Sequence, residues 1–467
     1  MKICAAGGRG GLKGQELIMK RALSYALLLA AGCGQGVHSK PGSDANGADA
    51  ADGPPGGFTV SGQVVGIDGQ PVVGDSVAVL GAPGVLSDAN GRFTITGVSP
   101  PYDLGVADSH STSAILYRGL TRPDPLVVFA PLTGPSYTAT ISGTVTGGTF
   151  GANDCVAVRF ESPDGVSPTS SDSSGIVPVC ADSGGAYTVT VTWHGPSVTS
   201  GTLRALWLRD YSPTSVPDGY GGYGSIPLTL SAGATLTGKN VALAAVSTAN
   251  ISGTMTAAAG FVPTLRSLRI QFADGEPGLW YMIRDSNTSG LGASFDYVVP
   301  VIAGATFVMV GGATSAADDV STRVLPALAP GTGIDVSVPA IAEASAPADN
   351  ATGVTGATPF SWSAGPAQSV YVASFGAAAG FPAYTVITTQ LGTTLGDFAQ
   401  LAMPLPSGTM YGWQVSEVAP FQSMDDYASA SGLAWQDYAD YSLPSATSYP
   451  TTPYSVSLPD GRSFYTQ

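Results

Sequence analysis

Short stretches in which apolar and polar residues alternate recur along the chain and predict β-strands. Alternation with a period of two places every apolar side chain on one face of an extended strand, which can then be buried. Three such stretches share a Ser-Gly pair, and each is predicted to open a domain: TVSGQVVG at 59–66, TISGTVTG at 140–147 and NISGTMTA at 250–257. A second set of apolar stretches is predicted to close these domains: PLVVFA at 125–130, KNVALAA at 239–245 and IDVSVPA at 334–340.

The spacing of these strands defines the expected architecture. Repeats of about 80 to 110 residues suit single β-sandwiches, whereas solenoid repeats are about 20 to 50 residues long. The 62 Gly and 35 Pro residues supply the turns that many short strands need. We therefore expect an all-β chain of tandem immunoglobulin/transthyretin-like sandwiches, in four units named here unit 1 (58–133), unit 2 (134–246), unit 3 (247–340) and unit 4 (341–467).

The segment before unit 1 has the pattern of a secretory signal. Lys20 and Arg21 follow Met19, an apolar run of about ten residues follows them, and small residues lead to Cys33. That run is about half as long as a membrane-spanning helix requires. We expect translation to start at Met19 rather than at Met1. Residues 34–57 carry too little apolar surface to fold and are predicted to form a disordered tether.

The sequence LAAGC, which ends at Cys33, resembles the lipobox of bacterial lipoproteins. The resemblance implies that Cys33 is lipidated and holds the chain on a membrane; the alternative is a chain that is cleaved and released. Ala30 departs from the pattern, because the family usually has Leu there. Gly34, rather than Asp, follows the cysteine, and by the same resemblance this implies the outer membrane, with the face left open.

Charge and cysteine content limit the partners and the chemistry that can be expected of the chain. The chain has 33 acidic and 18 basic residues, and its net charge of −15 excludes nucleic acid as a natural partner. Cys155 and Cys180 are the cysteines left after cleavage and lipidation, and they lack both the spacing and the His neighbours of a metal or redox site. In an oxidising compartment such a pair is predicted to form a disulfide.

Two units resemble known domain families. VSGQVVGIDGQPVVGDSVAVL at 60–80 and SDANGRFTITGVSPPYDLGV at 87–106 resemble the carboxypeptidase regulatory-like family of small transthyretin-like sandwiches. The turn that begins at Asp88 is not recognised in units 2 and 3, which we expect to share only the architecture. SAPADNATGVTGATPFSWSA, from residue 345, and YGWQV at 411–415 resemble fibronectin type III-like domains. This second resemblance implies that Trp362 and Trp413 are core residues.

No catalytic pattern is found. His38, His110 and His194 lack the spacing of a metal site, and the sequence contains no nucleophile elbow, no P-loop and no dinucleotide-binding motif. A triad of Asp108, His110 and a remote serine is disfavoured, because polar loop residues of this kind are common. The chain is predicted to be no enzyme and to need neither cofactor nor metal. A divergent hydrolase is the least favoured alternative.

Two clusters of aromatic and acidic residues allow a second interpretation. Sugar rings stack on aromatic faces while carboxylates accept hydrogen bonds from their hydroxyls. One cluster lies in unit 2 (Asp210, Tyr211, Tyr220 and Tyr223), and the other in unit 4 (Asp425, Asp426, Tyr427, Trp435, Asp437, Tyr438 and Tyr441). Tyr427, Trp435, Asp437 and Tyr438 are the possible ligand-binding residues. The favoured function is nevertheless a lipid-anchored scaffold, spacer or adhesion module with a protein or polysaccharide partner, and the alternative is a carbohydrate-binding surface lipoprotein.

Overall fold

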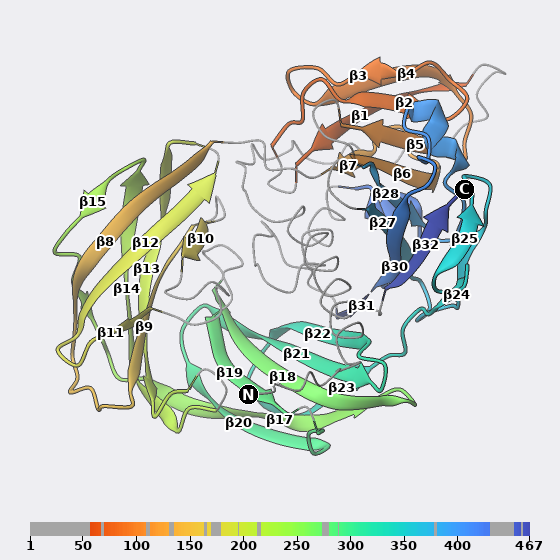
Figure 1. Cartoon of the computed structure of the whole chain (residues 1–467). Helices are drawn as coiled ribbons and strands as arrows, with labels where there is room; N and C mark the ends of the chain where they lie inside the picture. The colour runs from red at the N-terminus through yellow and green to blue at the C-terminus, as the bar shows by residue number, and fades with distance from the viewer. Residues whose placement is uncertain are drawn as a thin grey trace, which may run out of the picture.

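The computed structural model describes residues 57–66, 70–108, 113–129, 135–162, 166–169, 179–194, 196–212, 216–272, 280–287, 289–377, 381–429, 453–458 and 461–467. Within these residues the regular elements are β-strands, except for the 3-10 helix η1 (Gly396–Leu401) and the short helix α2 (Met424–Tyr427). The predicted all-β class is confirmed (Figure 1). The signal segment, Cys33 and nearly all of the tether lie outside the described residues.

Units 1, 2 and 3 are built around the same arrangement of strands. In each unit the opening strand lies in the middle, with an antiparallel neighbour on one side and the parallel closing strand on the other. The opening strands are β1 (Phe58–Val65), β8 (Ser136–Thr146) and β17 (Ser247–Ala257). Their antiparallel neighbours are β4 (Arg92–Val98), β12 (Ala186–His194) and β20 (Ser294–Val301). The closing strands are β7 (Leu126–Val128), the pair β15 (Thr235–Leu236) and β16 (Val241–Ala242), and β23 (Gly331–Val338).

The turn before β4 recurs before β12, although the two sequences look different. In unit 1 the Asp88 carboxylate accepts the Arg92 N–H at 2.8 Å, and in unit 2 the Asp182 carboxylate accepts the Ala186 N–H at 2.8 Å. The carbonyls of Gly91 and Gly185 then accept an N–H from the opening strand of their own unit, at 2.8 and 2.7 Å. The expectation that unit 2 lacks this turn is therefore wrong, because an Asp side chain and a following Gly are sufficient to form it.

The second sheet of unit 2 completes a sandwich. Its strand order is β11-β9-β13-β14, and β10 (Val166–Thr169) joins the opposite sheet beside β12. The strands are β11 (Val179–Ala181), β9 (Cys155–Glu161), β13 (Val198–Arg209) and β14 (Gly219–Ser231). Trp193, Phe160 and Val189 are buried between the two sheets, so unit 2 has a hydrophobic core of its own.

One long sheet runs through units 3, 4 and 1. Its strand order is β19-β18-β21-β22-β31-β30-β27-β28-β6-β5-β2-β3, with β25 and β32 attached beside β30, which makes 14 strands in the described residues. Unit 3 contributes β18 (Phe261–Phe272), β19 (Trp280–Ser286), β21 (Ala305–Ser315) and β22 (Val320–Leu328). Unit 4 contributes β25 (Ala351–Val354), β27 (Val370–Ala377), β28 (Ala383–Thr388), β30 (Met410–Ala419), β31 (Tyr454–Leu458) and β32 (Arg462–Thr466). Unit 1 contributes β2 (Ser76–Val79), β3 (Val85–Leu86), β5 (Tyr102–Ala107) and β6 (Ser113–Leu120).

The core of unit 4 lies between this sheet and a small three-stranded sheet. The small sheet consists of β24 (Ala344–Ala346), β26 (Phe360–Trp362) and β29 (Gly392–Thr393). Phe360 lies edge-on to Phe375 and to Trp413, with ring centroids 4.8 and 5.1 Å away. Trp362 and Trp413 are both buried, which confirms their predicted place in the core.

The order of the units in space differs from their order along the chain. Strand β28 of unit 4 pairs in parallel with β6 of unit 1, from Ala383 opposite Ser113 to Ile387 opposite Tyr117. Unit 3 is joined to unit 4 by antiparallel pairing of β22 with β31. The units therefore follow one another as 2, 3, 4, 1 around an arc, as Figure 1 shows. The sequence predicted tandem domains along the chain and left open which sheet edges meet; in the structure the sheet edges of units 1, 3 and 4 pair with one another.

Candidate functional site

The described residues offer no place for metal chemistry. They contain no group of three or more His, Cys, Asp and Glu side chains that could hold a metal ion. His194 ends β12 but its side chain is outside the described set, as are His38 and His110. Nor is any helix in the described ranges long and apolar enough to cross a membrane. The polar and aromatic clusters lie instead at three contacts between units, which we name the 1–4, 2–3 and 3–4 joints.

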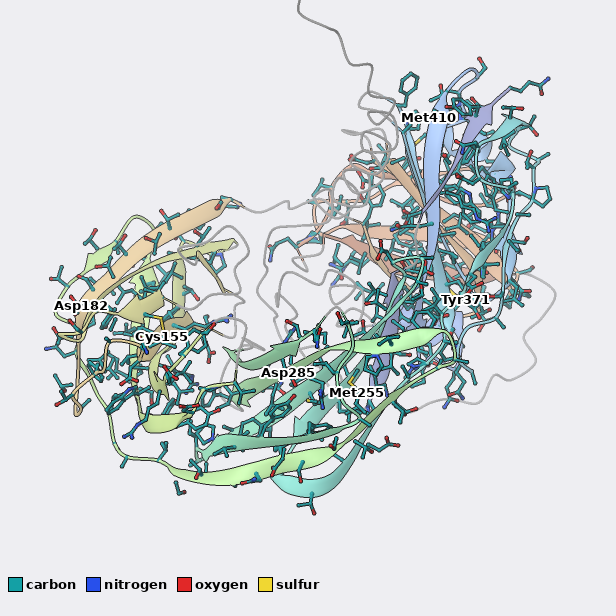
Figure 2. The ribbon with its side chains drawn as sticks, turned by 60° about the horizontal axis from the view of Figure 1, so that its bottom comes forward. Cys155, Asp182, Met255, Asp285, Tyr371 and Met410 are labelled. Atoms are coloured by element: carbon teal, nitrogen blue, oxygen red, sulfur yellow. A yellow bond between two sulfur atoms is a disulfide. The ribbon has the colours of Figure 1, made fainter. Side chains whose placement is uncertain are left out.

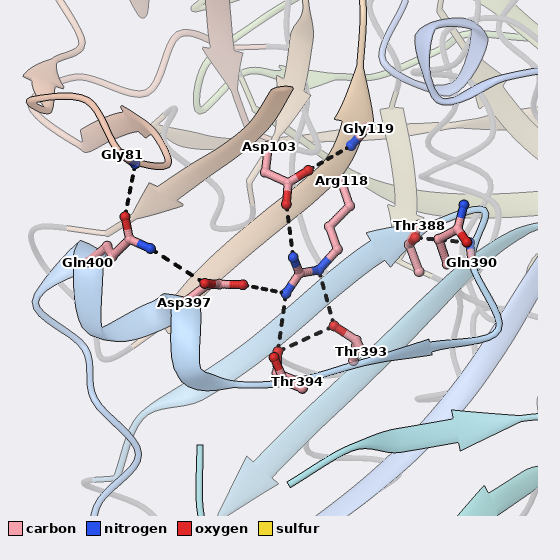
Figure 3. A network of polar contacts seen from close by, with 10 residues as sticks. All are labelled: Gly81, Asp103, Arg118, Gly119, Thr388, Gln390, Thr393, Thr394, Asp397 and Gln400. Atoms are coloured by element: carbon pink, nitrogen blue, oxygen red, sulfur yellow. Dashed lines mark hydrogen bonds and ion pairs between the residues drawn. The ribbon is translucent and has the colours of Figure 1, made fainter. Parts of the chain in front are cut away.

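At the 1–4 joint, Arg118 of β6 connects unit 1 to unit 4 (Figure 3). Its Nη1 lies 2.8 Å from Asp103 Oδ2 of unit 1, and its Nη2 lies 2.8 Å from Asp397 Oδ2 of η1. Its Nε donates to Thr393 Oγ1 at 3.2 Å. The Arg118 side chain is only 19% exposed, so these charge-assisted hydrogen bonds are partly shielded from water.

The side chain of Gln400 adds a second connection at this joint. Its Oε1 accepts the Gly81 N–H of unit 1 at 2.9 Å, and its Nε2 donates to Asp397 Oδ1 at 3.4 Å. The helix η1 thus presents two polar side chains to unit 1, as Figure 3 shows. Both Asp397 and Gln400 bind groups of the protein itself.

The acidic part of the C-terminal cluster also lies at the 1–4 joint. Asp425, in the first turn of α2, accepts hydrogen bonds from the N–H of Thr121 at 2.8 Å and of Arg122 at 3.1 Å, and from the Thr121 hydroxyl. The Arg122 guanidinium donates to the Asp425 carbonyl at 2.7 Å. Asp426 lies in the first turn of the same short helix, where its N–H donates to Oγ of the N-cap residue Ser423 at 3.1 Å. These carboxylates belong to a segment that ties unit 4 to unit 1.

Tyr427 is buried, contrary to its predicted place on a ligand-binding surface. It is 3% exposed, and its ring lies 5.1 Å from that of Phe421 and 6.4 Å from that of Tyr117 in unit 1. Burial raises the pKa of its hydroxyl well above the ordinary value. A side chain in this position cannot stack on a sugar, so Tyr427 is removed from the candidate ligand residues. Trp435, Asp437 and Tyr438 lie outside the described residues.

The aromatic cluster of unit 2 forms the 2–3 joint. Tyr220 is buried, and its hydroxyl donates to the Val298 carbonyl of unit 3 at 3.1 Å. The ring of Tyr223 stacks on Phe272 of unit 3 with centroids 5.6 Å apart. Tyr211 also packs against the core that the two units share. These tyrosines therefore fill an interface between units.

A buried ion pair lies beneath those rings. Arg204 Nε lies 2.7 Å from Glu161 Oε2, and the two side chains are 4% and 0% exposed. The guanidinium also donates to the Tyr223 hydroxyl at 2.7 Å and lies 3.9 Å from the centroid of Phe272. Burial opposes the charge on Arg204, but Glu161 and Tyr223 outweigh it and raise the pKa of the guanidinium. The pair thus couples β9 and β13 to unit 3.

At the 3–4 joint a single carboxyl is buried. Glu417 of β30 is 1% exposed, and its Oε2 accepts the N–H of Ala342 at 3.0 Å; Ala342 lies at the start of unit 4, in the segment that connects β23 of unit 3 to β24. The Glu417 N–H donates to Ser457 Oγ of β31 at 3.1 Å. Burial raises the pKa of this carboxyl to about 8, against the smaller opposing effect of the Ala342 N–H.

The predicted disulfide between Cys155 and Cys180 is confirmed, with Cα atoms 5.1 Å apart. It connects β9 to the neighbouring edge strand β11. Figure 2 labels Cys155 in unit 2, and its side chain packs in the core shared with unit 3, together with Leu206 and Leu208. The disulfide therefore fixes an edge of the sheet that faces the 2–3 joint.

The tryptophans give no described platform for a sugar. Four of the six have described side chains, and all four are buried: Trp193, Trp207, Trp362 and Trp413. Carbohydrate recognition by stacking needs aromatic faces that are open to solvent. Of the four predicted ligand residues, Trp435, Asp437 and Tyr438 lie outside the described residues, so burial does not remove them from the carbohydrate alternative.

Sequence reasoning missed the charged residues of the joints, above all Arg118, Glu161, Arg204 and Glu417. A signal was present, because only 11% of the chain is charged and these residues interrupt strands that are otherwise apolar or small. A charge inside such a strand is rare unless it is paired or hydrogen-bonded. The sequence alone does not name the partner, because each partner lies on another strand or in another unit.

Comparisons with known proteins place the chain only coarsely. No protein-family model matches it, and no curated protein matches it. Among solved structures it is distantly similar to the Bacillus anthracis TIE protein, at 11% identity and a TM-score of 0.15, over 61% of this chain and half of that one. It is also similar to BcpA, the major pilin subunit of Bacillus cereus, at 9% identity and a TM-score of 0.12, over 60% of this chain and 99% of that one.

A third similar structure is a carbohydrate-binding protein. It is the family CBM26 module of Eubacterium rectale Amy13K in complex with maltoheptaose, at 12% identity and a TM-score of 0.13, over 41% of this chain and 98% of that one. Chains so different in geometry carry no argument about function. The comparisons therefore assign no family, and the all-β class with several sheets rests on the strands of the chain itself.

Proposed function

We propose that the chain is a non-enzymatic, lipid-anchored cell-envelope protein that acts as a rigid scaffold or adhesion module. The observation that carries this proposal is the use of the chain's conspicuous polar and aromatic clusters. In the described residues, Arg118, Asp425, Tyr223 and Arg204 bind groups of neighbouring units. Such joints fix the units relative to one another, as a rigid scaffold requires.

Strand pairing between units supports a frame rather than a flexible spacer. A spacer is expected to have units joined by linkers that bend freely, whereas here two joints are made of backbone hydrogen bonds within one sheet. Moving unit 1 or unit 3 away from unit 4 would expose these bonds and bury nothing in exchange. A frame of this kind would hold a binding surface at a fixed orientation to the membrane.

The membrane anchor is tested by metabolic labelling. The full chain, including the segment from Met19, is expressed in a Gram-negative host that is fed an alkyne-bearing fatty acid. We expect labelled protein in the outer-membrane fraction, and we expect Cys33→Ala to be unlabelled. An unlabelled wild-type chain recovered from the soluble fraction would exclude the anchor.

The scaffold proposal is tested against carbohydrate recognition on the same protein. The full chain and its Trp435→Ala variant are applied to an array of glycans and cell-wall polymers. We expect no glycan whose binding depends on Trp435. Binding that is lost in Trp435→Ala would instead establish the carbohydrate-binding alternative.

A further inference from the structure

Glu417 contacts three separate parts of the chain. Its carboxyl accepts the Ala342 N–H, from the segment between β23 and β24, at 3.0 Å, and its backbone N–H donates to Ser457 Oγ of β31 at 3.1 Å. Its third neighbour is the turn between β26 and β27, at Gly365. The surroundings of the Glu417 carboxyl therefore change when the segment at Ala342 leaves β30.

The turn at Gly365 is fitted to this carboxyl. A Cβ atom at Gly365 would overlap Glu417 Oε2, so any side chain there would displace the carboxyl. The Gly365 N–H donates to the Tyr371 hydroxyl at 3.2 Å, and Tyr371 lies directly opposite Glu417 on the neighbouring strand. The close packing leaves the carboxyl without solvent, as its 1% exposure indicates.

The titratable groups around Glu417 do not supply a counter-charge. The segment between β23 and β24 carries Glu343 next to Ala342, and β27 carries Tyr371. The turn at Gly365 and the described side chains of β31 carry no charge. Within the described residues no cation forms an ion pair with Glu417, and no nearby charge contributes to its pKa. A carboxylate in this position would be a buried, unpaired charge, which is costly.

We propose that Glu417 makes the 3–4 joint sensitive to pH: the neutral acid keeps the segment at Ala342 docked on β30, and ionisation releases it. The inference concerns the joint alone and holds whether or not the chain is lipid-anchored. Water reaches the carboxyl only when the segment at Ala342 or the turn at Gly365 moves away. Ionisation therefore favours the open arrangement.

The direction follows from the two states. The docked state holds its proton up to a pKa of about 8, whereas an exposed glutamate loses it near its ordinary value of 4.5. Between these values the open state binds fewer protons, so docking weakens as the pH rises and is strongest in acid. The equilibrium constant for opening is expected to rise by up to about tenfold per pH unit between these two pKa values. Above the higher value it should no longer change with pH.

The experiment is hydrogen–deuterium exchange of the full chain at pH 5, 6.5 and 8, expressed as protection factors. We expect the protection of residues 340–344 to fall by about tenfold or more from pH 5 to pH 8. In Glu417→Gln, which keeps the shape of the side chain but cannot ionise, protection is expected to stay constant. Glu343→Gln, at the neighbouring position, is the matched control and should behave like the wild type.

Two outcomes would overturn the proposal. One is wild-type protection of 340–344 that does not change with pH, and the other is a Glu417→Gln variant that loses protection as the wild type does. If Glu417→Gln does not fold, the wild type alone decides the question. A loss confined to 340–344 and the turn at Gly365 then supports the joint, whereas an equal loss throughout the chain contradicts it.

Discussion

The glycine of the recurring Ser-Gly pair is required by the backbone of another strand. A Cβ atom would overlap the Pro125 carbonyl at Gly62, the Lys239 carbonyl at Gly143, and the Ile334 carbonyl at Gly253. In all three units the parallel closing strand, or the chain leading into it, therefore passes against this position. The repeat in the sequence is the mark of one packing contact that occurs three times.

We predict that Gly253→Ala destabilises unit 3. The added methyl group would overlap the Ile334 carbonyl, and relieving that overlap should cost about 1 to 3 kcal/mol. Gly292→Ala in the same unit is the control, because a methyl group added there would have no atom within 4 Å. Thermal unfolding followed by circular dichroism should show a lower Tm for Gly253→Ala alone. Equal Tm values for the two variants would refute the packing explanation.

The buried pair of Glu161 and Arg204 gives a second prediction at this scale. Arg204→Met removes the guanidinium that lies 2.7 Å from Glu161 Oε2, whereas Arg159 Nε stays 4.0 Å from Glu161 Oε1. Loss of the nearer cation from a buried carboxylate should cost about 3 kcal/mol.

Adding Glu161→Gln to Arg204→Met should recover part of that loss, because the buried charge is then absent. Urea unfolding of the wild type, both single variants and the double variant measures the coupling between the two residues. If the losses in free energy of unfolding of the two single variants add up to that of the double variant, Glu161 and Arg204 do not stabilise the fold as a pair.

At the scale of elements, the pairing of β6 with β28 depends on side chains as well as on the backbone. Arg118, Asp397 and Gln400 lie beside this pairing, and Asp425 holds the chain after β6 from the other unit. Ion pairs that remain partly exposed stabilise a fold only weakly, but this arginine binds two carboxylates at once. The Arg118 contacts are therefore expected to add to the backbone pairing at the 1–4 joint.

We predict that Arg118→Met weakens the attachment of unit 1 by about 1 to 2 kcal/mol. Differential scanning calorimetry should resolve an earlier transition for unit 1 in this variant. Arg92→Met, at an exposed position on β4, is the control and should unfold like the wild type. If neither variant shifts any transition, the Arg118 contacts do not hold the joint.

At the scale of the whole molecule, the order of the units in space makes a test of connectivity possible. Ser113 of β6 and Ala383 of β28 lie opposite each other in the parallel pairing, although they are far apart in sequence. Cysteines at both positions should form a disulfide under mild oxidation, and peptide mass spectrometry identifies it. Cysteines at Ser113 and at the exposed Ser200 of unit 2 are the control and should stay unlinked. Failure of the first pair to form would contradict the pairing of β6 with β28.

Prediction from the sequence was most successful for features that a short stretch of residues determines by itself. The alternation around each Ser-Gly pair gave the opening strands. The burial of Trp362 and Trp413 was implied by the resemblance of short stretches around them to fibronectin type III-like domains. It was least successful for the candidate ligand residues. Tyr427 has the composition of a sugar-binding surface around it, but its ring is packed between Phe421 and Tyr117.

The all-β class, the opening and closing strands of units 1 to 3, and the cysteines that form the disulfide could all be derived from the sequence. These follow from the period-two burial of a strand and from cysteine number, which are properties of short stretches or of counting. The sequence did not determine which sheet edges meet or which polar clusters form the joints. Only the tertiary structure decided these two points. Backbone hydrogen bonds at a free edge accept any strand, so the pairing of β6 with β28 is selected by shape, by charges such as Arg118 and by burial across units.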